Sequence, residues 1–104
     1  MLYDEYELLE IFESEPSIIV DKDTGIYNYQ KNDDCGFSIS LYISVHETFC
    51  ILTLKYKNFT DPIFSVKLND VIKIKADNNK LIVSQKSAKD VTVYFKPNFS
   101  FDLI

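Results

Sequence analysis

The sequence contains no arginine, one histidine and two cysteines, and each shortage excludes a class of site. Arginine carries the planar, two-pronged group that best recognises phosphate and guanine, so here lysine must supply all of the positive charge. One histidine and two cysteines without a Cys-x-x-Cys spacing do not form a zinc site. Since no cofactor-binding motif is present either, we expect neither a metal nor a cofactor.

Long apolar runs are also missing. No stretch approaches the roughly 18 apolar residues of a membrane-spanning helix. The first ten residues, MLYDEYELLE, have neither the basic start nor the apolar centre of a secretory signal. We therefore expect a cytoplasmic protein that has no contact with a membrane.

Patterns of catalytic residues are equally scarce. Ser44 and His46 stand two positions apart on one predicted strand, about 7 Å, which is beyond the hydrogen-bond reach of a nucleophile and its base. A nucleophile elbow is absent. The segment DKDTG at residues 21–25 faintly resembles a calcium loop but lacks the third ligand and the final glutamate. The sequence therefore predicts a protein that is not an enzyme.

What the sequence does contain is a regular alternation of apolar and polar residues. With 104 residues, 46% of them hydrophobic, the chain is long enough for one domain (1–104) with a single core. In GFSISLYISVH, residues 36–46, apolar side chains occupy every second position, which is the pattern of a half-buried strand. We expect this segment to be the central strand.

The remaining segments predict the fold class. Residues 4–13 have apolar side chains at helical spacing, with Asp4 as N-cap and Glu7 in the capping-box position. Within residues 71–76, Ile72 and Ile74 alternate with two lysines, so both isoleucines are expected on one face. The fold is α+β and mostly β: an N-terminal helix followed by an antiparallel β-sandwich or open barrel of about eight short strands. Besides the central strand, we expect strands at 17–20, 26–30, 50–56, 63–68, 71–76, 81–85, 90–96 and from 99 to the end of the chain.

The pairing of the central strand with residues 50–56 can also be predicted. Setting Val45 opposite Cys50 puts the apolar residues of both strands on one face, whereas a one-residue slip would place those of the second strand on the serine face. The connection is then a four-residue loop. In this register Cys35 and Cys50 lie about 33 Å apart. We therefore expect two free thiols, with Cys50 in the core.

Acidic residues are concentrated in the first third of the chain. The net charge is −5, but residues 1–34 hold ten acidic residues and two lysines, whereas residues 35–104 hold six and nine. This asymmetry suggests a basic partner and argues against non-specific nucleic-acid binding. On the predicted helix, Glu7 and Glu10 lie one turn apart with no lysine to offset their repulsion. The expected partner-binding residues are Tyr3, Glu7, Glu10, Glu13, Asp21, Asp23, Asp33 and Asp34.

Simpler explanations exist for these features, and two other functions stay open. The helix acids could form a solvated face, the aspartates are common turn residues, and Lys73 and Lys75 could protect an exposed sheet face. One alternative is a nucleotide- or single-stranded nucleic-acid-binding barrel, and the other is a structural or accessory interaction protein. In the nucleic-acid-binding barrel, bases would stack on Tyr27, Tyr29, Tyr42 and Tyr94.

Three segments of this small, acidic, β-rich chain together resemble a known family. They are YELLEIFESEP at 6–16, IVDKDTGIYNY at 19–29 and YFKPNFSFDL at 94–103. In this order they look like an immunity protein of a bacterial contact-dependent or polymorphic toxin system, over most of the chain in length and pattern. The resemblance implies that the protein binds a cognate toxin domain, often a basic nuclease, and blocks its active site. It assigns no individual residues, so the acidic positions above follow from charge alone.

Overall fold

The computed structural model describes residues 1–103, with every side chain in that range except that of Lys22. One α-helix, one short 3₁₀ helix and ten strands lie within it. This confirms the predicted class, an N-terminal helix followed by a mostly β body. In chain order the elements are β1 (Leu2–Tyr3), α1 (Glu5–Phe12), β2 (Ser17–Ile18), η1 (Lys22–Thr24), β3 (Ile26–Asn32), β4 (Phe37–Ser44), β5 (Phe49–Tyr56), β6 (Phe64–Leu68), β7 (Val71–Ala76), β8 (Lys80–Gln85), β9 (Val91–Tyr94) and β10 (Ser100–Asp102).

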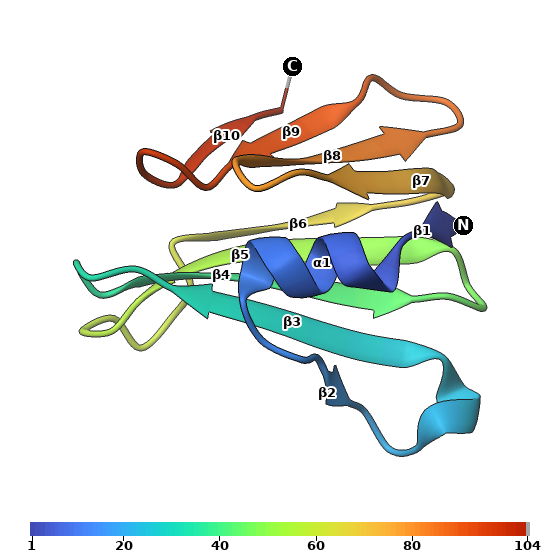
Figure 1. The fold of residues 1–104 in the computed structure, drawn as a ribbon, viewed down its shortest axis with the longest axis horizontal. Helices are drawn as coiled ribbons and strands as arrows, with labels where there is room; N and C mark the ends of the chain where they lie inside the picture. The colour runs from blue at the N-terminus through green and yellow to red at the C-terminus, as the bar shows by residue number, and fades with distance from the viewer. Residues whose placement is uncertain (104) are drawn as a thin grey trace.

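The strands form two five-stranded sheets, which Figure 1 shows one above the other. Sheet A has the order β1-β7-β8-β9-β10, and sheet B has the order β2-β3-β4-β5-β6. All pairings are antiparallel except that of β1 with β7. The chain passes from sheet B to sheet A between β6 and β7, which do not pair with each other in the described part of the chain. The sheets therefore form an open sandwich and not a closed barrel.

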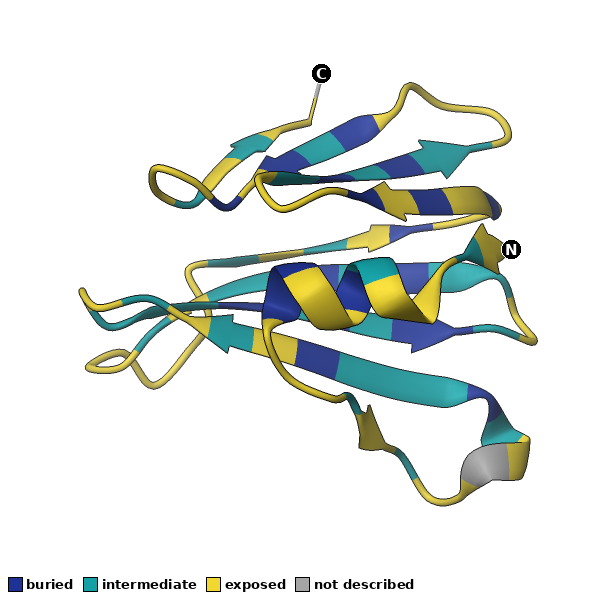
Figure 2. Ribbon diagram, viewed as in Figure 1, coloured by how far each residue is buried: buried dark blue, intermediate teal, exposed yellow. Residues whose placement is uncertain are grey.

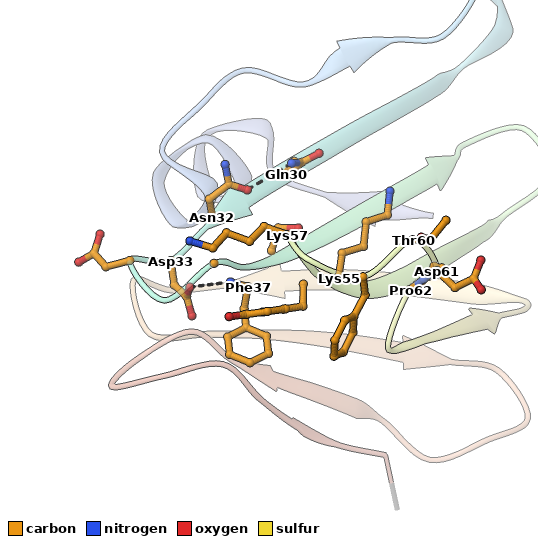
Figure 3. A pocket seen from close by; sticks show the side chains of 14 residues that line it. Gln30, Asn32, Asp33, Phe37, Lys55, Lys57, Thr60, Asp61 and Pro62 are labelled. Carbon is orange, nitrogen blue, oxygen red and sulfur yellow. Dashed lines mark hydrogen bonds between the residues drawn. The ribbon is translucent and has the colours of Figure 1, made fainter.

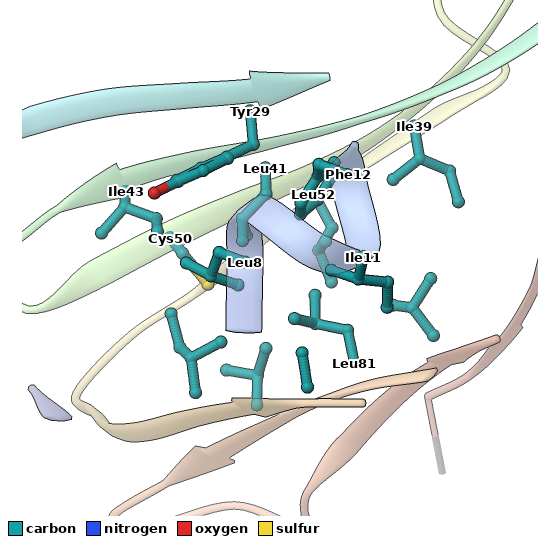
Figure 4. Close-up of a cluster of buried hydrophobic side chains, with 14 of the residues drawn as sticks. Leu8, Ile11, Phe12, Tyr29, Ile39, Leu41, Ile43, Cys50, Leu52 and Leu81 are labelled. Carbon is teal, nitrogen blue, oxygen red and sulfur yellow. The ribbon is translucent and has the colours of Figure 1, made fainter. Parts of the chain in front are cut away.

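Helix α1 closes the core between the two sheets. It packs against β3 of sheet B and β7 of sheet A, and it crosses the front of the molecule in Figure 1. Its buried side chains are Leu8, Ile11 and Phe12, which Figure 4 shows among the core residues. The Phe12 ring centroid lies 5.2 Å from that of Tyr29 in β3 and 5.3 Å from that of Phe95 just after β9. One helical side chain thus joins both sheets.

The N-terminal end of α1 follows the prediction in part. Asp4 is the N-cap, and its carboxylate accepts a 2.8 Å hydrogen bond from the backbone N–H of Tyr6. Glu7 faces β7 and accepts its hydrogen bond there, so it does not complete a capping box. At the other end Glu13 adopts a left-handed conformation with φ 58°, which stops the helix.

The β4–β5 hairpin corrects the predicted register by two residues. Cys50 pairs with Ile43 and not with Val45, and the four-residue loop moves accordingly. The reason lies partly in another segment: Val45 leaves the strand and donates its backbone N–H to the Gly25 carbonyl at 2.9 Å, while Thr48 takes a left-handed φ of 54°. Because the shift is two residues, every apolar side chain stays on the predicted face.

Strand β7 departs from the predicted alternation at a bulge. The register shifts between Val71 and Lys73, and Ile72 is 49% exposed while Val71 and Ile74 are buried. A bulge adds one residue to one strand, so the faces are exchanged on either side of it. The prediction that Ile72 shares the buried face of Ile74 is therefore wrong.

Strand β1 is the one strand that no predicted segment covers, and the last strand is shorter than predicted. Strand β1 is only two residues long and pairs in parallel with β7, and no alternation in the sequence indicates it. Strand β10 ends at Asp102, short of the predicted run to the end of the chain; Ile104 lies outside the described residues. The structure accordingly has ten strands where about eight were predicted.

Both cysteines are free, as predicted, with Cys35 exposed and Cys50 buried. Burial raises the pKa of the Cys50 thiol to about 12, so it stays protonated and packs as a small apolar residue. Within residues 1–103, no helix has the length and apolar character needed to cross a membrane.

Candidate functional site

Three predicted site residues lie on α1 or at its end, but their surroundings differ. Glu10 lies on the outward face of the helix, which Figure 2 shows as exposed. Glu7 is half-buried, and its carboxylate accepts a 3.0 Å hydrogen bond from the backbone N–H of Ala76 in β7. The carboxylate of Glu13 lies 3.0 Å from the Lys31 ammonium of β3. Two of the three acids are therefore engaged by the sheets.

Lys31 ties the C-terminal end of α1 to sheet B. Its ammonium also donates to the Ile11 carbonyl at 3.3 Å, near the end of the helix, where carbonyls lack helical partners. The hydrogen bond from Lys31, together with its charge, lowers the pKa of the Glu13 carboxyl. Because the Glu13 carboxylate is exposed, this ion pair adds little stability. Its main effect is to fix where the end of the acidic helix lies.

The two aspartate pairs lie at opposite ends of β3. Asp21 and Asp23 precede the strand, and the Asp21 carboxylate accepts the Asp23 N–H at 2.9 Å. Asp33 and Asp34 follow the strand, and the Asp33 carboxylate accepts two backbone N–H groups, each at 2.8 Å. Since β3 has seven residues and spans about 20 Å, the structure does not gather both pairs in one cluster. Asp21 and Asp33 shape turns.

The tyrosines of the stacking alternative do not share one surface. Tyr27 and Tyr29 lie on the inner face of β3, whereas Tyr42 lies on the outer face of β4, opposite Asn28. Tyr94 belongs to β9 in the other sheet. These side chains therefore do not form a single platform for bases.

A groove that the sequence analysis missed lies between α1 and strands β2 and β3, with a volume of about 300 Å³. Three large apolar side chains along it are exposed: Tyr6 by 80%, Leu9 by 38% and Ile18 by 45%. The available signal was that Tyr6 and Leu9 stand three residues apart, on one face of the helix. Of the predicted site residues, only Tyr3 lines this tyrosine groove. Its full lining is Tyr3, Glu5, Tyr6, Leu9, Glu15, Pro16, Ile18, Tyr27 and Tyr29.

The ionisable side chains of the tyrosine groove favour positive charge. The pKa of Tyr29 is raised to about 12, mainly by burial and to a smaller extent by the neighbouring Tyr3, Glu5 and Tyr27. The pKa of Tyr3 is raised as well, first by burial and then by Tyr27 and Glu5. Both phenols are therefore protonated at neutral pH. The lining also has two carboxyl side chains, Glu5 and Glu15, and no lysine. A cation is therefore stabilised there more than an anion.

A larger hollow of about 630 Å³ lies between the β3–β4 turn and residues 57–62, as Figure 3 shows. Gln30 and Asn32 of β3 and Phe37 of β4 are among the residues that line it. Two lysines offset two of its three aspartates, whereas no lysine offsets the two glutamates of the tyrosine groove, so a basic partner fits that groove better. The charged side chains of the hollow have both signs and are Asp33, Asp34, Lys55, Lys57 and Asp61.

The single histidine holds two turns together. The Nε2 atom of His46 lies 3.1 Å from the carbonyl oxygen of Asp23. Gly25 has φ +65°, the left-handed conformation, and a Cβ at this position would lie 2.8 Å from His46 Cδ2. Across residues 1–103, no group of three or more His, Cys, Asp and Glu residues could hold a metal ion.

Comparison with known proteins identifies a shared fold. No protein-family model matches the chain, and no curated protein matches it in sequence. A chain of a solved structure described as a contact-dependent growth inhibition toxin–immunity protein complex from Klebsiella pneumoniae 342 has the same fold, with a TM-score of 0.73. The alignment covers 95% of this chain and 90% of that chain at 23% identity. This likeness establishes that the two chains share a fold.

Proposed function

We propose that this chain is the immunity protein of a contact-dependent growth inhibition or related polymorphic toxin system. It binds a cognate toxin domain and neutralises it without catalysing a reaction. The observation that carries this proposal is the fold shared with a chain of a toxin–immunity protein complex. The three sequence segments that resemble such immunity proteins support it independently.

The charge of the chain favours the immunity role over the toxin role. A nuclease toxin must attract a polyanion, which requires positive charge. This chain has a net charge of −5 and no arginine, so it is suited to bind a basic nuclease domain. We further propose that it acts in the cytoplasm, where an incoming nuclease would meet nucleic acid.

We propose that the outward face of α1 makes the main contact. Glu10 lies on this face, Glu7 and Glu13 flank it, and Tyr3 is near its start. Asp21 and Asp23 at one end of β3, and Asp33 and Asp34 at the other, would add long-range attraction. Charges placed around a contact speed association more than they tighten the complex.

Growth protection tests this function. The chain is expressed in bacteria together with the toxin domain encoded beside its gene, and growth is compared with cells that express each protein alone. The proposal predicts arrest by the toxin domain alone, no arrest by this chain alone, and full growth with both. Arrest by this chain alone would assign it to the toxin side, and arrest despite co-expression would contradict the immunity role.

A further inference from the structure

The tyrosine groove stands apart from the rest of the surface because its exposed apolar side chains gather in one concavity. Tyr6, Leu9 and Ile18 come from α1 and β2, yet all three line the same hollow. Isolated exposed apolar residues need no explanation, but a contiguous apolar groove is typical of a binding site. Its volume of about 300 Å³ suits one or two side chains of a partner and not a folded element.

The chemistry of the lining selects one class of side chain. Tyrosine rings attract cations to their faces, and this attraction is used by arginine more often than by lysine. Glu5 and Glu15 add two carboxylates, and no described residue of the lining is basic. A guanidinium group can stack on a ring and donate to a carboxylate at once, whereas an anionic or purely aliphatic side chain can do neither.

The groove is also continuous with the proposed contact face. Leu9 of the lining is next to Glu10 in α1, and Tyr6 lies one turn before Glu10. A protein docked on the outward face of α1 therefore covers the groove as well. The tyrosine groove would receive a side chain from the same partner.

We propose that the tyrosine groove binds an arginine side chain of the toxin domain, an inference that rests on the immunity function proposed above. Tyr6 supplies the exposed aromatic face, and Glu5 and Glu15 supply the countercharge. The aromatic contact and the two carboxylates give specificity for arginine, whereas the aspartates at the two ends of β3 act through long-range attraction alone.

A peptide titration tests the groove without the toxin. The probe is an acetylated, amidated peptide of three Gly-Arg repeats, and the matched control peptide replaces each arginine with citrulline, which keeps the shape but not the charge. Amide shifts of the full chain are followed by NMR at low salt. We expect shifts to concentrate at residues 3–9, 15–18 and 27–29 with the arginine peptide, and to be absent with the citrulline peptide.

Matched variants separate the groove from general attraction. Tyr6→Leu keeps an apolar side chain but removes the ring, and should weaken peptide binding roughly two- to fivefold. Tyr94→Leu removes an exposed ring from sheet A and should leave binding unchanged. Glu15→Gln should weaken binding more than Asp90→Asn, which removes the same charge from the β8–β9 connection. Equal binding by the Tyr6 and Tyr94 variants, or shifts confined to other residues, would overturn the proposal.

The peptide titration and the growth assay test different claims, and each can fail without the other. If the chain protects cells but the groove variants bind the peptide as the wild type does, the groove assignment is wrong and the immunity function stands. If the peptide binds in the groove but the chain gives no protection, the toxin domain is excluded as the source of the arginine.

Discussion

The carboxylate of Glu7 and the backbone N–H of Ala76 are joined by a hydrogen bond of 3.0 Å, although 69 positions separate them in the chain. Glu7 lies on α1 and Ala76 is the last residue of β7, so this bond fastens the helix to sheet A. Glu10, one turn further along, is exposed. Acids that look equivalent in the sequence therefore have different roles, one structural and the other available to a partner.

Removing the Glu7 carboxylate should destabilise the protein. Glu7→Ala leaves the backbone N–H of Ala76 without its charged acceptor, so the free energy of unfolding should fall by about 1–2 kcal/mol. Urea denaturation measures the loss. The control is Glu10→Ala on the same helix, which should change the free energy of unfolding by less than about 0.5 kcal/mol. Equal effects of the two variants would show that the bond to Ala76 is not a stabilising contact.

The largest loss of stability from α1 should come from Phe12. Its ring contacts Tyr29 and Phe95 on the two sheets, so Phe12→Ala opens a cavity where three layers meet and should cost about 3–5 kcal/mol. Tyr6→Ala, an aromatic deletion on the exposed side of the same helix, is the control. Thermal unfolding compares them, and a Phe12 variant as stable as the Tyr6 variant would refute the described packing of the helix.

The ion pair between Glu13 and Lys31 predicts a pH dependence. The pKa of Glu13 is lower in the folded protein than its ordinary value of 4.5, so its contribution to stability is present above that value and is lost as the pH falls through the folded pKa. Denaturation midpoints of the wild type and Glu13→Gln should therefore differ at neutral pH and converge in acid. Added salt should also reduce the difference. If the difference between the two denaturation midpoints grew as the pH fell, a stabilising ion pair between Glu13 and Lys31 would be contradicted.

The two thiols should differ sharply in reactivity. Cys35 is exposed, whereas burial raises the pKa of Cys50 to about 12 and keeps it protonated. A thiol reagent such as Ellman's reagent should react with one cysteine per folded chain at pH 8 and with both in denaturant. Cys35→Ser should abolish the rapid reaction. Rapid reaction of both thiols in the folded wild type would place Cys50 outside the core.

The sequence predicts an element well where its local pattern of apolar and polar residues matches the burial of those residues in the fold. In β4, side chains that alternate in the sequence alternate between core and surface, and Asp4 caps the helix it precedes. The misses need information from elsewhere in the chain. The two-residue shift of Cys50 keeps every apolar side chain on the same face, so the hydrophobic pattern cannot distinguish the two registers. The pattern around Ile72 does not indicate a bulge. Both features are decided by contacts with other segments.

The candidate site was harder to predict because the distribution of charge along the sequence does not give the positions of the charged side chains in the fold. The sequence shows that acids are concentrated before residue 35, but not that Lys31 reaches back to Glu13 or that β3 separates the aspartate pairs. The tyrosine groove was missed because its walls come from α1, β2 and β3. Tyr6 and Ile18 line the same groove only once the helix has packed on the sheet.

The most direct test is the dissociation constant of this chain and the toxin domain encoded beside its gene, measured by calorimetry for Glu10→Lys and Asp90→Lys. The two variants change the net charge equally, but Glu10 lies on the proposed contact face and Asp90 in the β8–β9 connection. We predict a one-to-one complex that Glu10→Lys weakens roughly tenfold, more at low salt, while Asp90→Lys leaves it nearly unchanged. The absence of a complex with the wild type, or equal affinities of the two variants, would contradict the account.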